Sequence, residues 1–244
     1  MLGSYNSFKP ESKVKNKILK IIKVIVILFI FYQFLSVFII SSFIVKTSAM
    51  EPGIIKGQRI LSAPIISGAS LNIINIKIPG IKDPSRGDIF LIKPANSEKL
   101  ALYVKILDPV IRFFTLQKIS LDSNISKNWN NQLAVKRIIG IPGDTVKMQE
   151  YKYFIKPSGK KEYIPEENII DQEYIIVIPE NISGMDSSFP FSGSMEEIKL
   201  SENQYFAAND NRGVSYDSRL YGSVSRNDIL SPVFLSYDPG FSFK

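Results

Sequence analysis

The longest feature of the hydrophobic pattern is an uncharged apolar run over residues 24–45, VIVILFIFYQFLSVFIISSFIV. As a helix, these residues would rise about 33 Å at about 1.5 Å each, and the hydrocarbon core of a membrane is about 30 Å thick. A cleaved signal peptide is the alternative, but its apolar region usually has only about 7–15 residues. The run therefore predicts an uncleaved, membrane-spanning helix.

After this run the pattern changes to short β-rich segments, many of them separated by Gly, Pro, Asn or Asp. No long amphipathic helix is evident, and short strands with turns between them are typical of an antiparallel architecture. We therefore predict a mainly β domain, built from antiparallel sheet, over residues 46–244. The predicted strands are residues 59–61, 88–92, 134–139, 145–148, 151–155, 174–178, 205–208 and 229–237.

Two further stretches carry local predictions. In GIPGD at 140–144, the adjacent Pro142 and Gly143 fit the central positions of a type II turn, so we expect a hairpin between strands 134–139 and 145–148. Residues 102–132 are predicted to be an insertion. Its first part, 102–120, is apolar with scattered cations, which fits a strand, a broken helix or a surface that rests on lipid.

Composition excludes several kinds of chemistry. The chain has no cysteine and no histidine. Thiol nucleophiles, disulfides, Ser-His-Asp triads and His- or Cys-ligated metals are therefore impossible within it. A hydrolase with this composition must use a lysine or a carboxylate as its base. No motif for a metal, a nucleotide or a flavin is present, so we expect no cofactor and no metal.

The net charge of +7 lies mostly at the N-terminus, because six lysines and a single glutamate precede residue 24. A nearly neutral body is a poor candidate for binding nucleic acid. Lysines before an apolar run hold that end in the cytoplasm. We therefore predict a basic cytoplasmic tail over 1–23, an anchor over 24–45 and an exported domain over 46–244.

Lys136 is the residue that could act as a base. In a strand its side chain shares a face with Ala134 and Ile138, so apolar neighbours would desolvate the amine and lower its pKa. A neutral amine can take a proton from a hydroxyl group. The alternative is an ordinary strand lysine whose ammonium group reaches water. Arg137 points to the opposite face and fits a structural ion pair or a backbone contact.

The chain resembles the type I signal peptidases, which are membrane-anchored serine proteases that remove signal sequences from exported proteins. The resemblance rests on four blocks in the family's order, after a single anchor, over most of the exported domain. These blocks are TSAMEP at 47–52, SRGDIF at 85–90, AVKRIIGIPGD at 134–144 and NDNRGVSYDSRLYG at 209–222. One block alone would be weak evidence, whereas four in order are specific.

The resemblance implies a Ser/Lys dyad in which Lys136 is the general base. It also implies that Ser215 orients the lysine amine, that Asp217 and Arg219 hold their loop as a charged pair, and that Asp210 and Arg212 form its scaffold. Met50 and Pro52 are kept from the nucleophile segment. Asn209 and Gly213 depart from the family pattern, which usually has glycine where this chain has Asn209.

The nucleophile position also departs from the family pattern. The family serine directly precedes the methionine, and here that residue is Ala49. Thr47 matches a residue whose hydroxyl donates to the oxyanion in some members. Three accounts remain open: a natural inactive homologue, an engineered serine-to-alanine change, or a one-residue shift in which Ser48 is the nucleophile. Because neighbouring side chains of an extended backbone point to opposite faces, Ser48 would need a bulge or a turn.

The sequence therefore predicts a single-pass protein of the bacterial cytoplasmic membrane that acts on signal peptides of exported proteins. Signal peptides and membrane lipid are the expected partners. The rival interpretation is an inactive homologue, natural or engineered, that binds signal peptides or a partner enzyme without cleaving them.

Overall fold

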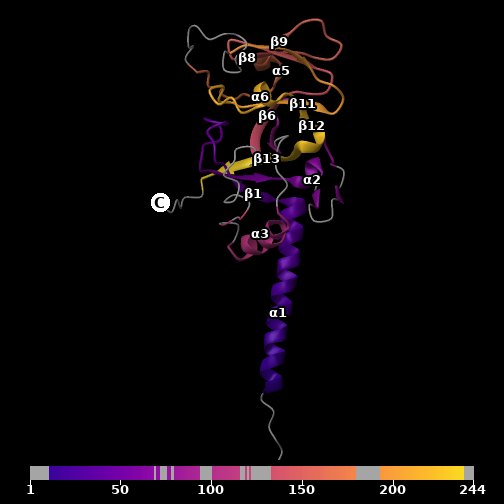
Figure 1. The fold of residues 1–244 in the computed structure, drawn as a ribbon, viewed down its shortest axis with the longest axis vertical. Coiled ribbons are helices and arrows are strands. Elements are labelled where there is room, and N and C mark those ends of the chain that lie inside the picture. Colours follow the sequence, from indigo (N-terminus) through magenta and orange to yellow (C-terminus); the bar gives the residue numbers. More distant parts are fainter. Residues whose placement is uncertain are drawn as a thin grey trace, which may run out of the picture.

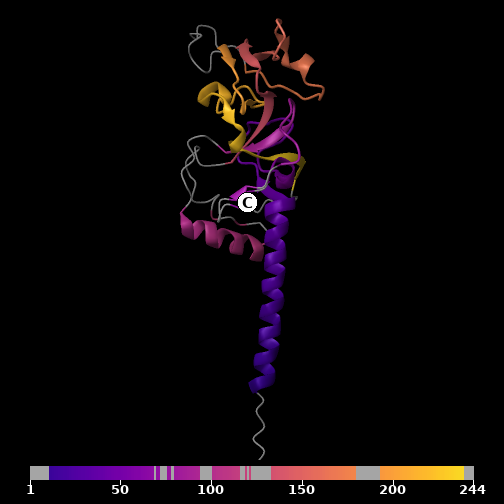
Figure 2. The same ribbon diagram turned by 90° about the vertical axis from the view of Figure 1, so that its right-hand side faces the viewer.

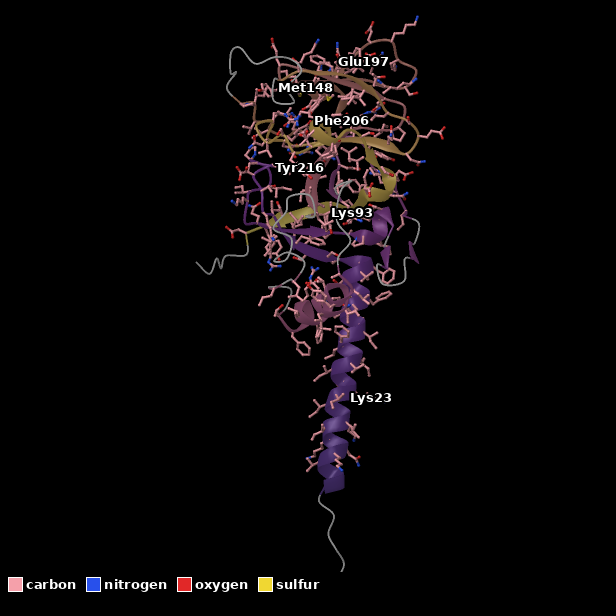
Figure 3. The ribbon with its side chains drawn as sticks, in the orientation of Figure 1. Lys23, Lys93, Met148, Glu197, Phe206 and Tyr216 are labelled. Atoms are coloured by element: carbon pink, nitrogen blue, oxygen red, sulfur yellow. The ribbon has the colours of Figure 1, made fainter. Side chains whose placement is uncertain are left out.

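One long helix projects from a β-rich body in the computed structural model (Figure 1). The helix, α1, covers Glu11–Phe34 and continues as a π-helical segment, η1, over Leu35–Ile39. Lys23 lies on α1 well away from the β-rich body (Figure 3). The structure describes residues 11–68, 70–71, 76–77, 80–93, 101–115, 119, 121, 133–179 and 193–238.

The helix that begins with α1 is long and apolar enough to cross a membrane over Val14–Ile39, and none of its most apolar stretch is buried in the protein. Its limits differ from the predicted span of 24–45. The helix begins earlier because its lysines are good helix formers. It ends earlier because residues 41–44 leave it and become strand β1 (Ser41–Ile44).

The predicted upper boundary was wrong because apolar composition does not separate a helix in lipid from a strand in a sheet. β1 pairs along its whole length with β2 (Arg59–Ser62), in antiparallel register from Ser41 opposite Ser62 to Ile44 opposite Arg59. The end of the apolar run is therefore an edge strand of the main sheet.

The main sheet has seven strands, and a second sheet has four. All strand pairs in the described residues are antiparallel, so the predicted mainly β fold is confirmed. In spatial order the main sheet holds β1, β2, β13 (Ile229–Tyr237), β5 (Ile89–Ile92), β6 (Ala134–Gly140), β11 (Gln204–Ala208) and β12 (Val224–Ser225). The second sheet holds β10 (Met195–Lys199), β7 (Thr145–Gln149), β8 (Lys152–Lys156) and β9 (Ile164–Pro165). A separate pair joins β3 (Ser70–Leu71) to β4 (Ile76–Lys77).

Helices other than α1 are short in the described part of the chain. They are α2 (Pro64–Ser67), α3 (Leu102–Phe114), α5 (Glu166–Ile169), α6 (Ser218–Tyr221) and the 3₁₀ turn η3 (Arg226–Asp228). α3 is an amphipathic helix of 13 residues, which the sequence analysis left open between a strand, a broken helix and a lipid-facing surface. Pro109 lies inside it and obscured the helical pattern. Most of the rest of the predicted insertion, from 122 to 132, lies outside the described residues.

The predicted hairpin between β6 and β7 is wrong, although the turn between them forms. The Asp144 amide donates to the Ile141 carbonyl at 3.1 Å, and Gly143 has φ +88°, as a type II turn requires at its third residue. β6 pairs with β5 and β11, whereas β7 pairs with β8 and β10. The turn therefore carries the chain from one sheet to the other.

The predicted strand at 174–178 is also wrong. Within it the structure gives only one isolated bridge, in which Val177 pairs with Asn211 in parallel.

The hydrophobic core has three parts. One of them, around Ile139, Tyr153 and Phe206, packs the four-stranded sheet against β6 and β11. The packing fixes the strand that carries Lys136.

Candidate active site

The four sequence blocks that resemble the signal peptidase pattern meet around β6. Arg86, in the second block, binds Asp144 in the third with two hydrogen bonds of 2.7 and 3.0 Å. Arg137 donates to both carboxylate oxygens of Asp210, at 2.8 and 2.6 Å, and to the Gly87 carbonyl at 2.7 Å. Buried charges are stable only when paired in this way, so these contacts lock the blocks together.

Lys136 is buried on β6, with only 3% of its surface exposed. By strand alternation its side chain shares a face with Ile138, and its direct neighbour on β5 is Phe90. The Nζ atom donates to Oδ1 of Asn209 at 2.5 Å. Burial lowers the pKa of the Lys136 amine to about 8, against an opposing effect of the Asp217 carboxylate and in the same direction as Arg219. The site thus holds an amine that loses its proton near pH 8, more than two pH units below an ordinary lysine, which favours a role as a general base.

Asn209 is itself held on every side. It is fully buried, its backbone amide donates to Asp217 Oδ2 at 3.0 Å, and its Nδ2 donates to the Val214 carbonyl at 2.5 Å. With Nδ2 occupied as the donor, Oδ1 is fixed toward Lys136. Asp217 also forms a buried ion pair with Arg219 at 2.9 Å. Asp217 therefore positions Asn209, and Asn209 positions the lysine amine.

A second buried ion pair supports the same loop. Arg212 pairs with Glu166 of α5 and also donates to the Asn209 carbonyl. Tyr174 adds a hydrogen bond to Glu166 Oε1 at 3.2 Å, and the Arg212 guanidinium lies 4.6 Å from the centre of the Tyr153 ring. Arg212 and Glu166 therefore attach the loop that carries Asn209 to α5.

Sequence reasoning missed the roles of Asn209 and Glu166. Asn209 carried a signal, because it departs from the glycine that the family pattern usually has there. Glu166 carried none: in the sequence it is one of two adjacent glutamates, 166 and 167, and nothing distinguishes the buried one from the exposed one.

The segment that holds Ala49 is a turn rather than an extended strand. The Glu51 amide donates to the Ser48 carbonyl at 3.2 Å, and Asn211 donates to the carbonyls of Ser48 and Ala49 at 3.2 and 3.0 Å. Strand alternation, which would have turned Ser48 away from the face of residue 49, therefore does not apply here. The sequence analysis required a bulge or a turn for Ser48 to serve as the nucleophile, and the segment forms a turn.

The side chains of this segment differ in exposure. Ala49 is buried, with 2% exposed, whereas Ser48 is half-buried and Thr47 is exposed. Asn211, which binds the segment, lies two residues after Asn209, which binds Lys136. Met50 packs in the same hydrophobic cluster as Val135, the residue before Lys136. These contacts bring the two segments to one place.

The roles of Lys136 as the base and of Thr47 as an oxyanion donor stay predictions, and so do two expectations about contacts at the site. One is that the Lys136 amine lies within reach of a side chain of residues 47–50. The other is that Ser215 orients this amine: the described contact of Ser215 is made by its carbonyl, which accepts from the Asp217 amide at 2.9 Å. Within the described residues, no group of three or more acidic side chains is placed to hold a metal ion.

Comparison with known proteins agrees with the four blocks. Residues 18–237 match the family described as signal peptidase, peptidase S26. The chain therefore belongs to the signal peptidase family, and the family resemblance drawn from the sequence is confirmed.

Relatives extend over nearly the whole chain. A probable signal peptidase I-2 of Synechocystis is 25% identical over 233 residues, which is 96% of this chain and 79% of the relative. Signal peptidase I P of Bacillus subtilis subsp. natto is 25% identical over 95% of each chain. A crystal structure of a signal peptidase I from Enterococcus faecalis covers 64% of this chain and 100% of its own, at 20% identity and a TM-score of 0.31.

Proposed function

We propose that this protein acts on the signal peptides of exported proteins at the site around Lys136. Membership of the signal peptidase family supports this substrate class. The apolar helix over Val14–Ile39 and the lysines at its start support a single-pass protein of the bacterial cytoplasmic membrane. Its N-terminus is then cytoplasmic, and its β-rich body lies on the export side.

The observation that carries the proposal is the buried Lys136 amine, which binds Asn209 on the same loop from which Asn211 binds the carbonyls of Ser48 and Ala49. In a Ser/Lys dyad a neutral amine takes the proton of a serine hydroxyl as the oxygen attacks the peptide carbonyl. Ala49 has no oxygen, and loss of the nucleophile costs about 10⁶ in turnover in a serine protease where it has been measured. The protein with Ala49 therefore binds signal peptides and cleaves them far more slowly than the Ala49→Ser variant does.

A second candidate function is cleavage with Ser48 as the nucleophile. The turn from Ser48 to Glu51 favours it, because a turn frees neighbouring side chains from alternation. Ser48 is also half-buried, whereas Ala49 beside it is buried. Lys136 would be the base in both cases.

Binding tests the substrate class separately from cleavage. A dye-labelled peptide that covers the apolar core and cleavage region of a signal peptide is titrated with the protein in detergent micelles, and anisotropy is measured. A peptide of the same composition in scrambled order controls for uptake into micelles. We expect saturable binding of the signal peptide to the protein with Ala49, which does not consume the peptide during the titration. Equal binding of the scrambled peptide would overturn the proposal.

A further inference from the structure

Helix α3 turns an apolar side away from the rest of the protein. Side chains three or four residues apart lie on one side of a helix, and on α3 the exposed ones share one arc. The exposed apolar side chains are Leu102, Tyr103, Ile106, Leu107, Val110 and Phe114. Amphipathic helices of soluble domains place such a side against the core. On α3 the arrangement is reversed.

The inward side of α3 carries Asp108 and Arg112. Arg112 donates to the Ser42 carbonyl of β1 at 2.9 Å, and its guanidinium lies 5.5 Å from the centre of the Phe43 ring. Asp108 accepts from the Leu121 amide at 2.6 Å. Val104, on the same side, is buried. These contacts fix the rotation of α3 about its axis, so its apolar side cannot turn inward.

The C-terminal end of α3 packs against α1. The Phe113 ring lies 5.3 Å from the rings of both Phe29 and Tyr32, measured between centroids. Tyr32 precedes Ile39, the last residue of the apolar helix, by about 10 Å along the axis. Figure 2 shows α3 running sideways from α1, on the side of the β-rich body that faces the long helix.

We propose that α3 lies in the interface of the membrane that α1 spans, with its apolar side among the lipid acyl chains. Lipid is the occupant because the exposed side is continuous with the exposed apolar surface of α1, at the depth of Phe29 and Tyr32. A helix in this position inserts its apolar side about 5–10 Å. Two helices at a large angle then restrain the tilt of the β-rich body, because Arg112 ties α3 to β1.

The absence of cysteine allows a direct test by site-directed spin labelling. Single variants Leu107→Cys, Val26→Cys and Lys160→Cys are labelled and reconstituted into phosphatidylcholine and phosphatidylglycerol vesicles. Val26 is exposed on α1, and Lys160 is exposed in the turn after β8. Power saturation measures access of the labels to oxygen, which partitions into lipid, and to a water-soluble nickel chelate. Circular dichroism checks that each variant keeps its fold.

We expect the label at residue 107 to behave like that at residue 26, several-fold more accessible to oxygen than to the chelate, with the reverse at residue 160. Ready access of the chelate to residue 107 would overturn the proposal, because this side would then face water. Protection from both reagents would overturn it as well, because protein would then cover it. The measurement uses no signal peptide, so its result is independent of the proposed peptidase function.

Discussion

The surroundings of Lys136 decide whether its amine can act as a base. Burial lowers its pKa to about 8, and the Asp217 carboxylate prevents a larger shift. The amine is therefore mostly protonated at pH 7 and mostly neutral above pH 8. Only the neutral form can accept a proton from a hydroxyl, so a base at this position works better as the pH rises.

A pH profile follows from this balance. In the Ala49→Ser protein, we expect cleavage of a signal-peptide substrate to rise with pH and to reach half its maximum near pH 8. Initial rates at low substrate concentration, measured between pH 6 and 10, test this. Lys136→Arg in the same background is the control, because a guanidinium stays charged throughout and should give no cleavage. A flat profile would show that Lys136 does not titrate as the base.

Asn209 offers a sharper test, because its amide touches the amine directly. Replacing it with Ala removes an acceptor that favours the charged amine, so the pH profile of the Ala49→Ser protein should shift to lower pH and the maximal rate should fall. Asn209→Asp places a negative charge against Lys136 and should shift the profile to higher pH. A purely structural role for Asn209 predicts equal profiles with reduced yield of folded protein.

At the scale of elements, the loop after β11 depends on α5 and on Glu166 in particular. Glu166 and Arg212 are each 1% exposed at the side chain, so removing either partner leaves a buried, uncompensated charge. The neighbouring pair of Glu167 and Lys152 is about half exposed and 3.3 Å apart. The adjacent glutamates therefore form a matched comparison.

We expect Glu166→Ala to lower the free energy of unfolding by about 3–5 kcal/mol, as loss of one partner of a buried ion pair does. Glu167→Ala should lower it by less than about 1 kcal/mol, because its pair is screened by water. Chemical denaturation in detergent micelles measures both. Similar losses for the two variants would contradict the assigned burial of the first pair.

The elements also show which parts of the structure the sequence could predict. Strands such as β5, β6 and β11 were predictable because they are short runs rich in apolar residues that lie between turn residues. β1 was not, because its apolar residues continue those of the helix before it. The hairpin failed because local turn chemistry fixes the turn, whereas long-range packing decides which strands pair. A Cβ at Gly140 would lie 2.8 Å from Leu200 Cδ1, a closeness that no local pattern records.

The candidate site was predictable to a similar extent. Lys136 stood out because a motif surrounds it, and the partners of the charged residues did not. Arg212 and Asp210 are two residues apart in the sequence, yet they bind Glu166 and Arg137 on different elements. Which of several glutamates is buried depends on the fold of the whole domain.

At the scale of the whole molecule, the described residues hold one helix that is long and apolar enough to cross a membrane, followed by a β-rich body. Under the positive-inside rule, the lysines that begin α1 predict a cytoplasmic N-terminus. The β-rich body would then lie on the export side, where the cleavage regions of signal peptides emerge. α3 would lie in the interface of that same side.

Topology can be tested in the cysteine-free chain by labelling Ser12→Cys and Lys160→Cys in intact cells with a thiol reagent that does not cross the membrane. We expect labelling from the export side only at residue 160, and labelling at residue 12 only after the cells are opened. Labelling of residue 12 in intact cells would reverse the orientation.

We propose that the site keeps its base, Lys136, and lacks its nucleophile at residue 49. The most direct measurement compares cleavage of one preprotein by the unsubstituted protein, by Ala49→Ser and by Ser48→Ala, each purified in the same detergent. We predict that Ala49→Ser cleaves the preprotein several orders of magnitude faster than the unsubstituted protein. Ser48→Ala should cleave it at the same rate as the unsubstituted protein. The contradicting result is cleavage by the unsubstituted protein at a rate close to that of Ala49→Ser, with loss of this cleavage in Ser48→Ala. That result would identify Ser48 as the nucleophile.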